Sequence, residues 1–346
     1  MTAPDDGLLI IDGRTVHELL PMADAVDLMD QVFRSHSAGR SRQPLRTVLA
    51  GGDAGALATM PAVVAGPESD PAPVFGVKAM VIKPGNARYG LGPHCGVVLV
   101  FDAATGRPSA LVDGVALTAV RTAAASAAAT RALARPGSAV LAVVGAGTQA
   151  RSHIAALAEV LPALREVRIW NRGADRARRL ADWARTKLPT VEIRYEPDIG
   201  GALRGSDVVC TTTASDRPLV SASMLAPGTH LNAIGASFRG KRELDTSVVQ
   251  RAAVFVDSRE SARNEADDLL IPLQEGGLPA DFTPTEVGEV LLGDHPGRTG
   301  DDQITVFKSL GIAAQDVAAA RHLQERARRS GAGIRVPAIG FEPADG

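Results

Sequence analysis

The chain has 346 residues, 45% of them hydrophobic and 22% charged, with a formal net charge of -2. This length predicts two domains, and the charge balance is that of an ordinary soluble protein rather than of one that binds a polyanion. Only two cysteines occur, Cys95 and Cys210, so a disulfide scaffold is excluded and a reducing, cytoplasmic setting is expected.

We expect no leader peptide and no membrane, metal or nucleic-acid partner. The start, MTAPDDGLLIIDG, lacks the basic region and the cleavage site of a signal peptide. The apolar stretches are far shorter than the ~18 residues that a membrane span needs. There is no C-x-x-C pair or histidine cluster, and 3% aromatic residues argue against a stacking surface for single-stranded nucleic acid.

The first part of the chain, from Leu8 to about Asp113, is β-rich and is interrupted by one helix that begins at Pro21. Strands that follow one another without helices suggest an antiparallel sheet or an open barrel. The expected strands are separated by Gly/Pro clusters and cover 44–50, 56–64, 74–82 and 96–102.

The alanine-rich segment Thr118–Ala134 predicts a helix that connects two domains, and Arg135-Pro136-Gly137 ends it. Strands and helices then alternate, which is the pattern of a doubly wound parallel sheet. The expected strands are 139–144, 166–170, 191–195, 207–212, 230–234, 253–256 and 304–308, and the helices are 149–161, 174–187, 199–203 and 311–329.

A glycine-rich motif, G-x-G-x-x-A, follows the first strand of that pattern and opens a helix. The first glycine permits a tight turn, the second lets a pyrophosphate approach the backbone, and the small third residue allows the helix to pack closely on the strand. Small residues can also serve packing alone. We expect a dinucleotide to contact Gly145, Ala146, Gly147, Thr148, Gln149 and Ala150.

The second strand of the nucleotide-binding pattern ends in Trp170-Asn171-Arg172. An NAD site usually has a carboxylate here to bind the ribose 2′-hydroxyl. Asn171 does not repel a phosphate and Arg172 can pair with one, so the sequence favours NADP over NAD, with NAD possible. The alternative is that Arg172 points into solvent.

Several stretches together resemble the ornithine cyclodeaminase and mu-crystallin family over nearly the whole length: GVKAM, ALTAVRTAAASA, VVGAGTQARSH, VRIWNR, HLNAIGASFRGKRELD, VFVDS and TVFKSLGIAAQD. The resemblance implies a homodimer that uses a nicotinamide cofactor to make or reduce an imino acid. It also implies the fold class: an α/β chain with a Rossmann domain at 124–309 and an α+β substrate and dimerisation domain at 1–123 and 310–346.

The same resemblance implies that Arg46, Lys78 and Arg121 hold the substrate carboxylate. A guanidinium can clamp a carboxylate with two hydrogen bonds, and further cations neutralise it. Each of the three residues could instead be a surface charge. Against this, Lys78 is the only charge in the apolar run 74–82, and Arg121 is the only one between Asp113 and Arg131.

Ser237 stands where the family's cyclodeaminases carry an aspartate that deprotonates the substrate amine. Serine cannot do this at neutral pH, so plain reduction of an imine is favoured, as in the ketimine reductases. Ser237 would bind the imine or the nicotinamide carboxamide, or it is merely a polar turn residue. Asp257 and Asp268 are the nearest spare carboxylates.

The remaining cofactor contacts are expected at Thr122, Thr211, Thr213 and Ile234. Thr211 and Thr213 lie where a parallel strand ends, and loops at that end line the ligand crevice, although threonine also occurs there as a strand former. His94 could contact the ligands or be a loop histidine, and His153 is expected on a helix face of the Rossmann domain.

These residues predict an NADPH-dependent reductase of small α-imino acids, such as pyrroline-2-carboxylate or piperideine-2-carboxylate. Lys78 could also donate a proton if burial lowers its pKa. The alternatives are reductive amination of a 2-keto acid as in alanine dehydrogenase, ornithine cyclodeamination, and a non-catalytic ligand-binding protein.

Overall fold

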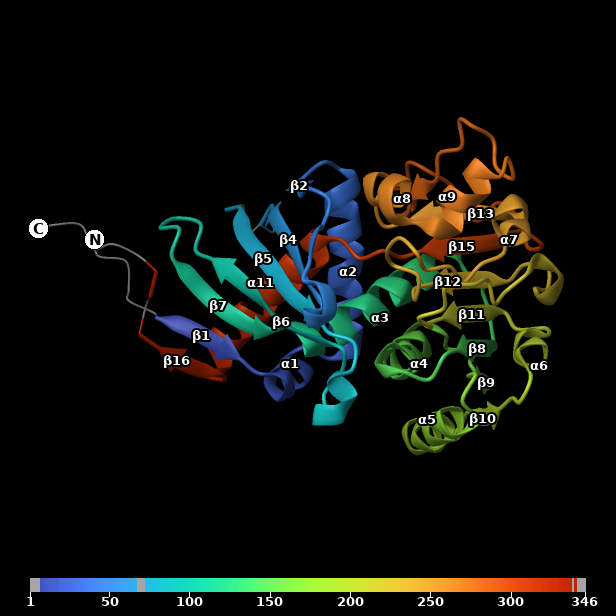
Figure 1. Ribbon diagram of the computed structural model, residues 1–346, viewed down its shortest axis with the longest axis horizontal. Coiled ribbons are helices and arrows are strands. Elements are labelled where there is room, and N and C mark those ends of the chain that lie inside the picture. The colour runs from blue at the N-terminus through green and yellow to red at the C-terminus, as the bar shows by residue number, and fades with distance from the viewer. Residues whose placement is uncertain (1–6, 67–71, 338, 341–346) are drawn as a thin grey trace, which may run out of the picture. The chain divides into compact units, whose positions relative to one another are not determined.

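The computed structural model describes residues 7–66, 72–337 and 339–340. The expectation of no leader peptide depends partly on residues 1–6, which lie outside the described residues. The chain divides into two compact units (Figure 1). Unit 1 is Met1–Arg121 with Ile312–Gly346, and unit 2 is Thr122–Gly311. The expected domain boundaries, after residues 123 and 309, differ from these by two residues. Within the described ranges, no helix is long and apolar enough to cross a bilayer.

The described part of unit 1 contains an open, mixed sheet in the order β16-β1-β7-β6-β5-β4-β2, with β3 also paired to β4. The expected antiparallel pairing holds from β4 to β7, but β1 runs parallel to β7, and the strands form no closed barrel. The strands are β1 Leu8–Ile11, β2 Ser41–Arg42, β3 Thr47–Ala50, β4 Ala56–Val64, β5 Val74–Ile82, β6 His94–Phe101, β7 Pro108–Asp113 and β16 Ile334–Val336.

One face of this sheet is covered by α11, which contacts β4, β5 and β6 and also packs against α2. The contact is close at Gly76, where a Cβ would lie 2.8 Å from Val317. Buried residues of α2 and α11, such as Met29, Phe33 and Leu323, complete the core of unit 1. The helices of this unit are α1 Gly13–Leu19, α2 Met22–Ser37, α11 Ala313–Ser330 and the short 3-10 turns η1 Gly52–Ala54 and η2 Asn86–Tyr89.

The connecting helix α3 spans Gly114–Leu133 and so begins four residues before the expected start. Asp113 accepts hydrogen bonds from the backbone N–H groups of Val115 and Ala116, which caps this first turn. Most residues of α3 are buried. Many of them are alanines, whose small side chains allow neighbouring segments to pack closely against the helix. Arg121 belongs to unit 1, and the residues from Thr122 onward belong to unit 2.

Unit 2 has a fully parallel sheet among its described strands, in the order β10-β9-β8-β11-β12-β15-β13-β14. This confirms the doubly wound prediction. The chain starts at β8, adds β9 and β10 on one side and then β11 and β12 on the other. The carboxyl ends of β8 and β11 therefore flank the topological switch point, where ligands bind in such sheets.

The strands of unit 2 are β8 Val140–Val144, β9 Glu166–Trp170, β10 Glu192–Tyr195, β11 Val208–Thr211, β12 His230–Ala233, β13 Ala252–Val256, β14 Thr285–Glu286 and β15 Ile304–Lys308. Its helices are α4 Thr148–Val160, α5 Ala174–Lys187, α6 Ile199–Leu203, α7 Thr246–Arg251, α8 Arg259–Glu265, α9 Asp267–Gln274, α10 Val287–Leu292 and the 3-10 turn η3 Ala222–Met224. The core packs apolar strand residues such as Val209, Leu231 and Val306 against Leu244, Val248 and Leu269.

Candidate active site

Three charged side chains meet in the interior of unit 1: Lys78 on β5, Arg121 on α3 and Asp316 on α11. All three are buried. The Lys78 Nζ and the Arg121 Nε each lie 3.0 Å from the same carboxylate oxygen of Asp316. A second guanidinium nitrogen of Arg121 donates to Gln315 Oε1 at 2.6 Å. Two of the three cations expected to hold a carboxylate are therefore brought together; we call these residues, with Arg46, the cation cluster.

The cation cluster carries more positive than negative charge. Burial lowers the pKa of Lys78 to about 8, the charges of Arg121 and Arg46 act in the same direction, and Asp316 opposes them. Burial alone would raise the pKa of Asp316, but Arg121 and Lys78 outweigh it, so this pKa is lowered and the carboxylate is ionised. With Lys78 protonated, the two cations Lys78 and Arg121 share one carboxylate, so one positive charge is left in excess beside Asp316 for an anionic ligand.

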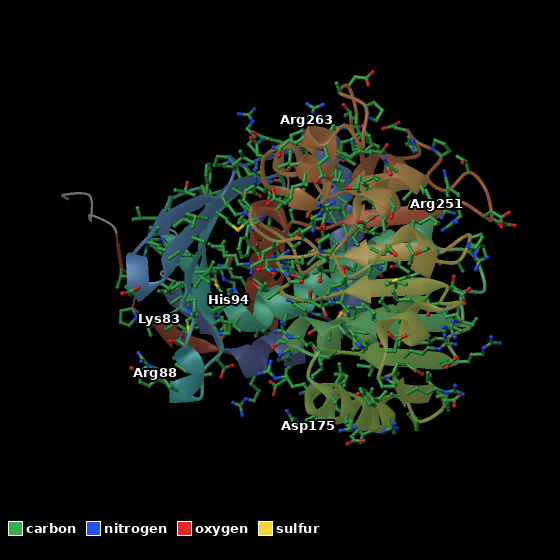
Figure 2. The ribbon with its side chains drawn as sticks, turned by 45° about the vertical axis from the view of Figure 1, so that its right-hand side comes forward. Lys83, Arg88, His94, Asp175, Arg251 and Arg263 are labelled. Atoms are coloured by element: carbon green, nitrogen blue, oxygen red, sulfur yellow. The ribbon has the colours of Figure 1, made fainter. Side chains whose placement is uncertain are left out.

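Arg46 and His94 lie at the margin of the cation cluster. Arg46 is half-buried and lies just before β3 rather than inside a strand. Its positive charge lowers the pKa of Lys78. His94 is the first residue of β6, at the same end of unit 1 as Lys83 and Arg88 (Figure 2). Desolvation and the charge of Lys78 lower the pKa of His94, although its side chain reaches the surface. Both residues are thus coupled electrostatically to Lys78.

Asp316 and Gln315 also belong to this cluster, although they were not predicted from the sequence. Both follow directly on an apolar run, and both are completely buried on α11. An ionisable side chain on the buried face of a helix is rarely tolerated without a partner, so its position was a usable signal. The partners could not be found in this way, because Lys78 lies 238 residues away along the chain.

The glycine-rich turn of unit 2 has the geometry that a pyrophosphate requires. Gly145 has a φ of +118°, and a Cβ there would come within 2.6 Å of the Thr212 hydroxyl. Gly147 is the N-cap of α4 without a side-chain hydrogen bond, and a Cβ at this position would meet nothing within 4 Å. The helix N-terminus therefore faces open space with uncapped N–H groups, which fits a bound phosphate. Ala150 is buried, whereas Gly147 and Thr148 are exposed and Ala146 and Gln149 half-buried.

Asn171 and Arg172 directly follow β9, next to the glycine-rich turn in the sheet, since Gly145 N donates to Trp170 O at 2.8 Å. Asn171 is half-buried and donates to Gly173 O at 2.9 Å, which leaves its side chain tied to the local turn. Arg172 is exposed. Both the phosphate-binding and the solvent-facing roles of Arg172 agree with this exposure.

Thr211 and Thr213 lie at the end of β11, as expected, but their hydroxyls donate to Glu243, at 2.8 and 2.7 Å. Thr211 is completely buried, whereas Thr213 is half-buried and keeps its hydroxyl oxygen as an acceptor for a cofactor. The view of Asp257 and Asp268 as spare carboxylates is wrong. Asp257 accepts from the N–H groups of Leu310 and Gly311, and Asp268 pairs with Lys308 at 2.9 Å.

The other expected site residues lie in unit 2. Ser237 is half-buried in the loop after β12, and Ile234 is buried at the end of that strand. Thr122 is buried on α3 with a hydroxyl oxygen that has no hydrogen-bond partner within the described chain. His153 is buried on α4, 3.0 Å from Ser126 Oγ and 2.7 Å from Gln149 O, and burial lowers its pKa to about 4. His153 is therefore neutral and structural. The described residues hold no group of metal-binding side chains.

Comparison with known proteins gives one consistent result. Residues 9–331 match the model of the ornithine cyclodeaminase/mu-crystallin family. The mouse ketimine reductase mu-crystallin is 37% identical over 290 residues, which are 84% of this chain and 86% of the relative. The structure of Thermococcus litoralis Δ1-pyrroline-2-carboxylate reductase with NADH and L-proline is 31% identical, with a TM-score of 0.89 over 95% of this chain and all of the other.

An archaeal alanine dehydrogenase dimer with bound NAD is similar to the same degree. It is 31% identical, with a TM-score of 0.88 over 97% of this chain and 99% of the other. The similar proteins thus have different activities on one fold, so the similarity alone does not identify a substrate. They do agree on the family: the chain belongs to the ornithine cyclodeaminase/mu-crystallin family.

Proposed function

We propose that the protein is an NAD(P)H-dependent reductase of small α-imino acids. The observation that carries this proposal is the cation cluster, because Lys78 and Arg121 share the single carboxylate of Asp316, and the positive charge left in excess is buried and suits one small carboxylate. The glycine-rich turn of unit 2 adds a fitting site for a dinucleotide. The activities of the mouse and Thermococcus litoralis relatives, ketimine reduction and pyrroline-2-carboxylate reduction, support the same reaction class.

In this proposal each residue of the cation cluster has a distinct role. Arg121 and Arg46 bind the substrate carboxylate and orient the adjoining C=N bond. Asp316 holds Lys78 and Arg121 in place before substrate arrives. Lys78, with a pKa of about 8, is ionised at neutral pH and supplies a proton or a positive charge beside the imine nitrogen. A bound reduced nicotinamide supplies the hydride that the imine carbon accepts.

Cyclodeamination is not part of this proposal. It needs a base for the substrate amine, and Ser237 offers a hydroxyl where a carboxylate would be required. Neither neighbouring carboxylate can replace it, since Asp257 binds two backbone N–H groups and Asp268 is paired with Lys308. Ser237 is then a hydrogen-bond donor to the imine or to the nicotinamide carboxamide.

We propose NADPH as the preferred cofactor, with NADH accepted. The support is local: Asn171 and the exposed Arg172 follow β9, where a carboxylate would repel a 2′-phosphate. The cofactors in the similar structures are NADH and NAD, so a measured preference for NADPH would distinguish this chain from them.

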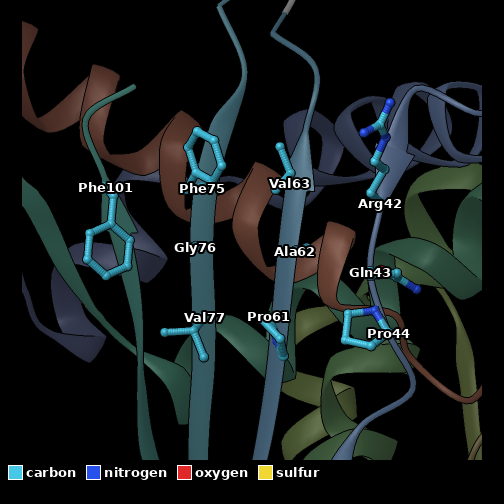
Figure 3. Close-up of a pocket in the computed structure, with 10 residues that line it drawn as sticks. All are labelled: Arg42, Gln43, Pro44, Pro61, Ala62, Val63, Phe75, Gly76, Val77 and Phe101. Atoms are coloured by element: carbon cyan, nitrogen blue, oxygen red, sulfur yellow. The ribbon is translucent and has the colours of Figure 1, made fainter. Parts of the chain in front are cut away.

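We further propose a homodimer through the uncovered face of the unit 1 sheet. On this face Val63, Phe75 and Phe101 stand opposite one another on β4, β5 and β6, with Pro61 and Val77 in the next row (Figure 3). They line an apolar groove of about 520 Å³, and Phe75 is 46% exposed. Such a continuous apolar face is typical of an interface, and the alanine dehydrogenase it resembles is a dimer.

The dimer is tested by sedimentation velocity with Phe75→Glu. This variant should sediment as a monomer, because it places a charge in the middle of the apolar face. Ile334→Glu, which changes an exposed apolar residue on β16, is the control and should leave the dimer intact. A Phe75→Glu dimer as stable as the wild type contradicts this interface.

We place the protein in the cytoplasm because Cys95 is an exposed free thiol and Cys210 a buried one. An exposed thiol persists most readily in a reducing compartment. Fractionation of cells that express the protein at native level tests this directly, and enrichment with secreted or envelope proteins would contradict it.

The reaction is tested by a turnover screen that follows the reduced nicotinamide absorbance. Preformed cyclic imino acids, and 2-keto acids with and without ammonia, are each offered with NADPH and NADH. We expect fastest oxidation with a cyclic imino acid and NADPH. Turnover restricted to pyruvate with ammonia would instead establish an alanine dehydrogenase, a second candidate that the similar archaeal structure favours. Absence of turnover on the whole panel would support a non-catalytic binding protein.

A further inference from the structure

Glu243, Asp268 and Lys308 form a second buried charged cluster, in unit 2, that the proposed reaction does not use. All three are completely buried. Glu243 lies in the segment after β12, Asp268 in the first turn of α9, and Lys308 at the carboxyl end of β15. Buried charges are tolerated only where they are paired or well hydrogen-bonded, so the arrangement around them is informative.

The carboxylate of Glu243 joins the two loops that follow β11 and β12. One oxygen accepts from the backbone N–H and the hydroxyl of Thr213, both at 2.7 Å. The other accepts from the Thr211 hydroxyl at 2.8 Å, from Gly235 N at 2.7 Å and from Ala236 N at 3.3 Å. A single side chain thus satisfies five donors from two neighbouring strand ends.

The rest of the cluster holds Glu243 itself. Asp268 accepts from the backbone N–H groups of Glu243 and Leu244, at 2.8 and 2.9 Å. The other carboxylate oxygen of Asp268 lies 2.9 Å from Lys308 Nζ. Burial, and to a lesser extent the charge of Asp268, raise the pKa of Glu243, while Lys308 and the donors of Thr213 act against this rise. The lysine charge therefore helps to keep the buried glutamate ionised.

The same loops border the glycine-rich turn and tolerate little displacement. A Cβ at Gly145 would collide with Thr212, which lies between the two threonines bound by Glu243. A Cβ at Gly235 would come within 1.9 Å of Thr213 O and 2.6 Å of Glu243 Oε1. Thr213 and Ile234, two of the expected cofactor contacts, lie on these two loops, as does Ser237, which is expected at the imine or the nicotinamide carboxamide.

We infer that Glu243 is the positioning residue for the dinucleotide crevice: its buried carboxylate fixes the loops after β11 and β12 in the binding geometry before the cofactor arrives. The identity of the ligand, a dinucleotide, is the one part of this inference that rests on the proposed function. The role requires a carboxylate, because a glutamine has one acceptor oxygen and an NH2 donor. In either orientation its NH2 would face a backbone N–H, that of Thr213 or that of Gly235.

The test compares Glu243→Gln with Asp207→Asn. Asp207 is a matched control at the amino ends of the strands, where it accepts from Ala139 N, from Val140 N and from Arg135. Each variant is studied by hydrogen exchange without cofactor and by NADPH titration, followed through cofactor fluorescence. For Glu243→Gln we expect faster exchange at Thr213, Gly235 and Ala236, and an NADPH Kd raised about tenfold or more.

Asp207→Asn should lower Tm by a similar amount but leave the NADPH Kd within about twofold of the wild-type value, since it leaves the crevice loops untouched. Equal rises in Kd for both variants, or an unchanged Kd in Glu243→Gln, would overturn the inference. If Glu243→Gln does not fold, Thr211→Val takes its place, because it removes one of the five donors to Glu243 at a completely buried position. We then expect a smaller rise in the NADPH Kd and faster hydrogen exchange at Thr213. An unchanged Kd and an unchanged exchange rate in Thr211→Val would also overturn the inference.

Failure of the proposed function gives a different result. A wild-type protein that binds neither NADPH nor NADH would refute the dinucleotide site. The exchange rates at Thr213, Gly235 and Ala236, measured without any ligand, would still decide whether Glu243 fixes the loops.

Discussion

The two buried charged clusters of this chain are built alike and balanced differently. In unit 1, Asp316 is shared by Lys78 and Arg121, with Arg46 close enough to influence them. In unit 2, Lys308 forms an ion pair with Asp268. Its positive charge also lowers the pKa of Glu243. The first cluster is short of anions, whereas in the second the carboxylate of Glu243 is saturated by protein donors.

This difference separates a binding site from a support. A buried surplus of positive charge is unfavourable until an anion arrives, so the unit 1 cluster can use a substrate carboxylate. The negative charge of Glu243 is already satisfied by five donors, so it has little left to offer a ligand and instead fixes the loops that donate to it. Substitutions that change this balance test the distinction.

The largest effect is expected for Arg121→Met, because it removes the central guanidinium and leaves Asp316 and Gln315 short of a partner. Truncating one partner of a buried, hydrogen-bonded charge pair in a complex costs about 2–5 kcal/mol, so loss of the pair between Arg121 and the substrate carboxylate should lower kcat/KM for the imino acid about 1000-fold. Steady-state kinetics measure this. Arg14→Met, which breaks an exposed pair with Glu18, is the control and should change kcat/KM less than twofold, as is usual for such pairs at about 0–1 kcal/mol.

A smaller loss, about 100-fold in kcat/KM, is expected for Lys78→Met, since Arg121 still binds the carboxylate. In the wild type, kcat/KM should fall as pH rises through about 8, because Lys78 loses its proton there. Lys78→Arg keeps the charge at all these pH values and should abolish that limb. A wild-type profile that stays flat from pH 7 to pH 10 would remove Lys78 from this role.

Asp316→Asn probes the shared anion. Its charge raises the pKa of Lys78, so its removal should lower that pKa further and move the alkaline limb below pH 8. We expect kcat/KM at pH 7 to fall about tenfold, since the cations lose their anchor and Lys78 is less fully protonated. The pH profile is the decisive readout. A limb that stays at about 8 would show that Asp316 has only a packing role.

The smallest effect concerns a charge outside both clusters. Arg172→Asp should raise the NADPH Kd about tenfold or more through repulsion of the 2′-phosphate, with the NADH Kd changed less than about threefold. Fluorescence titration of both cofactors measures this. Arg179, exposed on α5, offers the control Arg179→Asp. Equal changes in both affinities after Arg172→Asp would place this side chain in solvent.

Local signals predicted the parallel sheet of unit 2 well. The β-branched run of β8, Gly145 and the start of α4 all lie within one short stretch, and each agrees with the others. The β-rich character of unit 1 was also predicted, but β1, β7 and β16 were missed. Their pairing joins Leu9 to Ala110 and to Arg335, and no local pattern reports such distant partners.

The candidate site was predictable to the same extent. Lys78 and Arg121 stood out as lone charges in apolar segments, and the structure buries both. Their partner Asp316 and the loop anchor Glu243 did not stand out, because their roles depend on contacts made across the fold. Glu243 accepts donors from 7 to 32 residues away, and Asp316 pairs across 195 and 238 residues.

The most direct test offers the enzyme a matched pair of substrates: pyrroline-2-carboxylate and 1-pyrroline, the same ring without its carboxylate. With NADPH at pH 7, kcat/KM should favour the carboxylate by about 1000-fold in the wild type, and this ratio should collapse in Arg121→Met. Equal turnover of the two imines by the wild-type protein would contradict a carboxylate-binding role for the unit 1 cations.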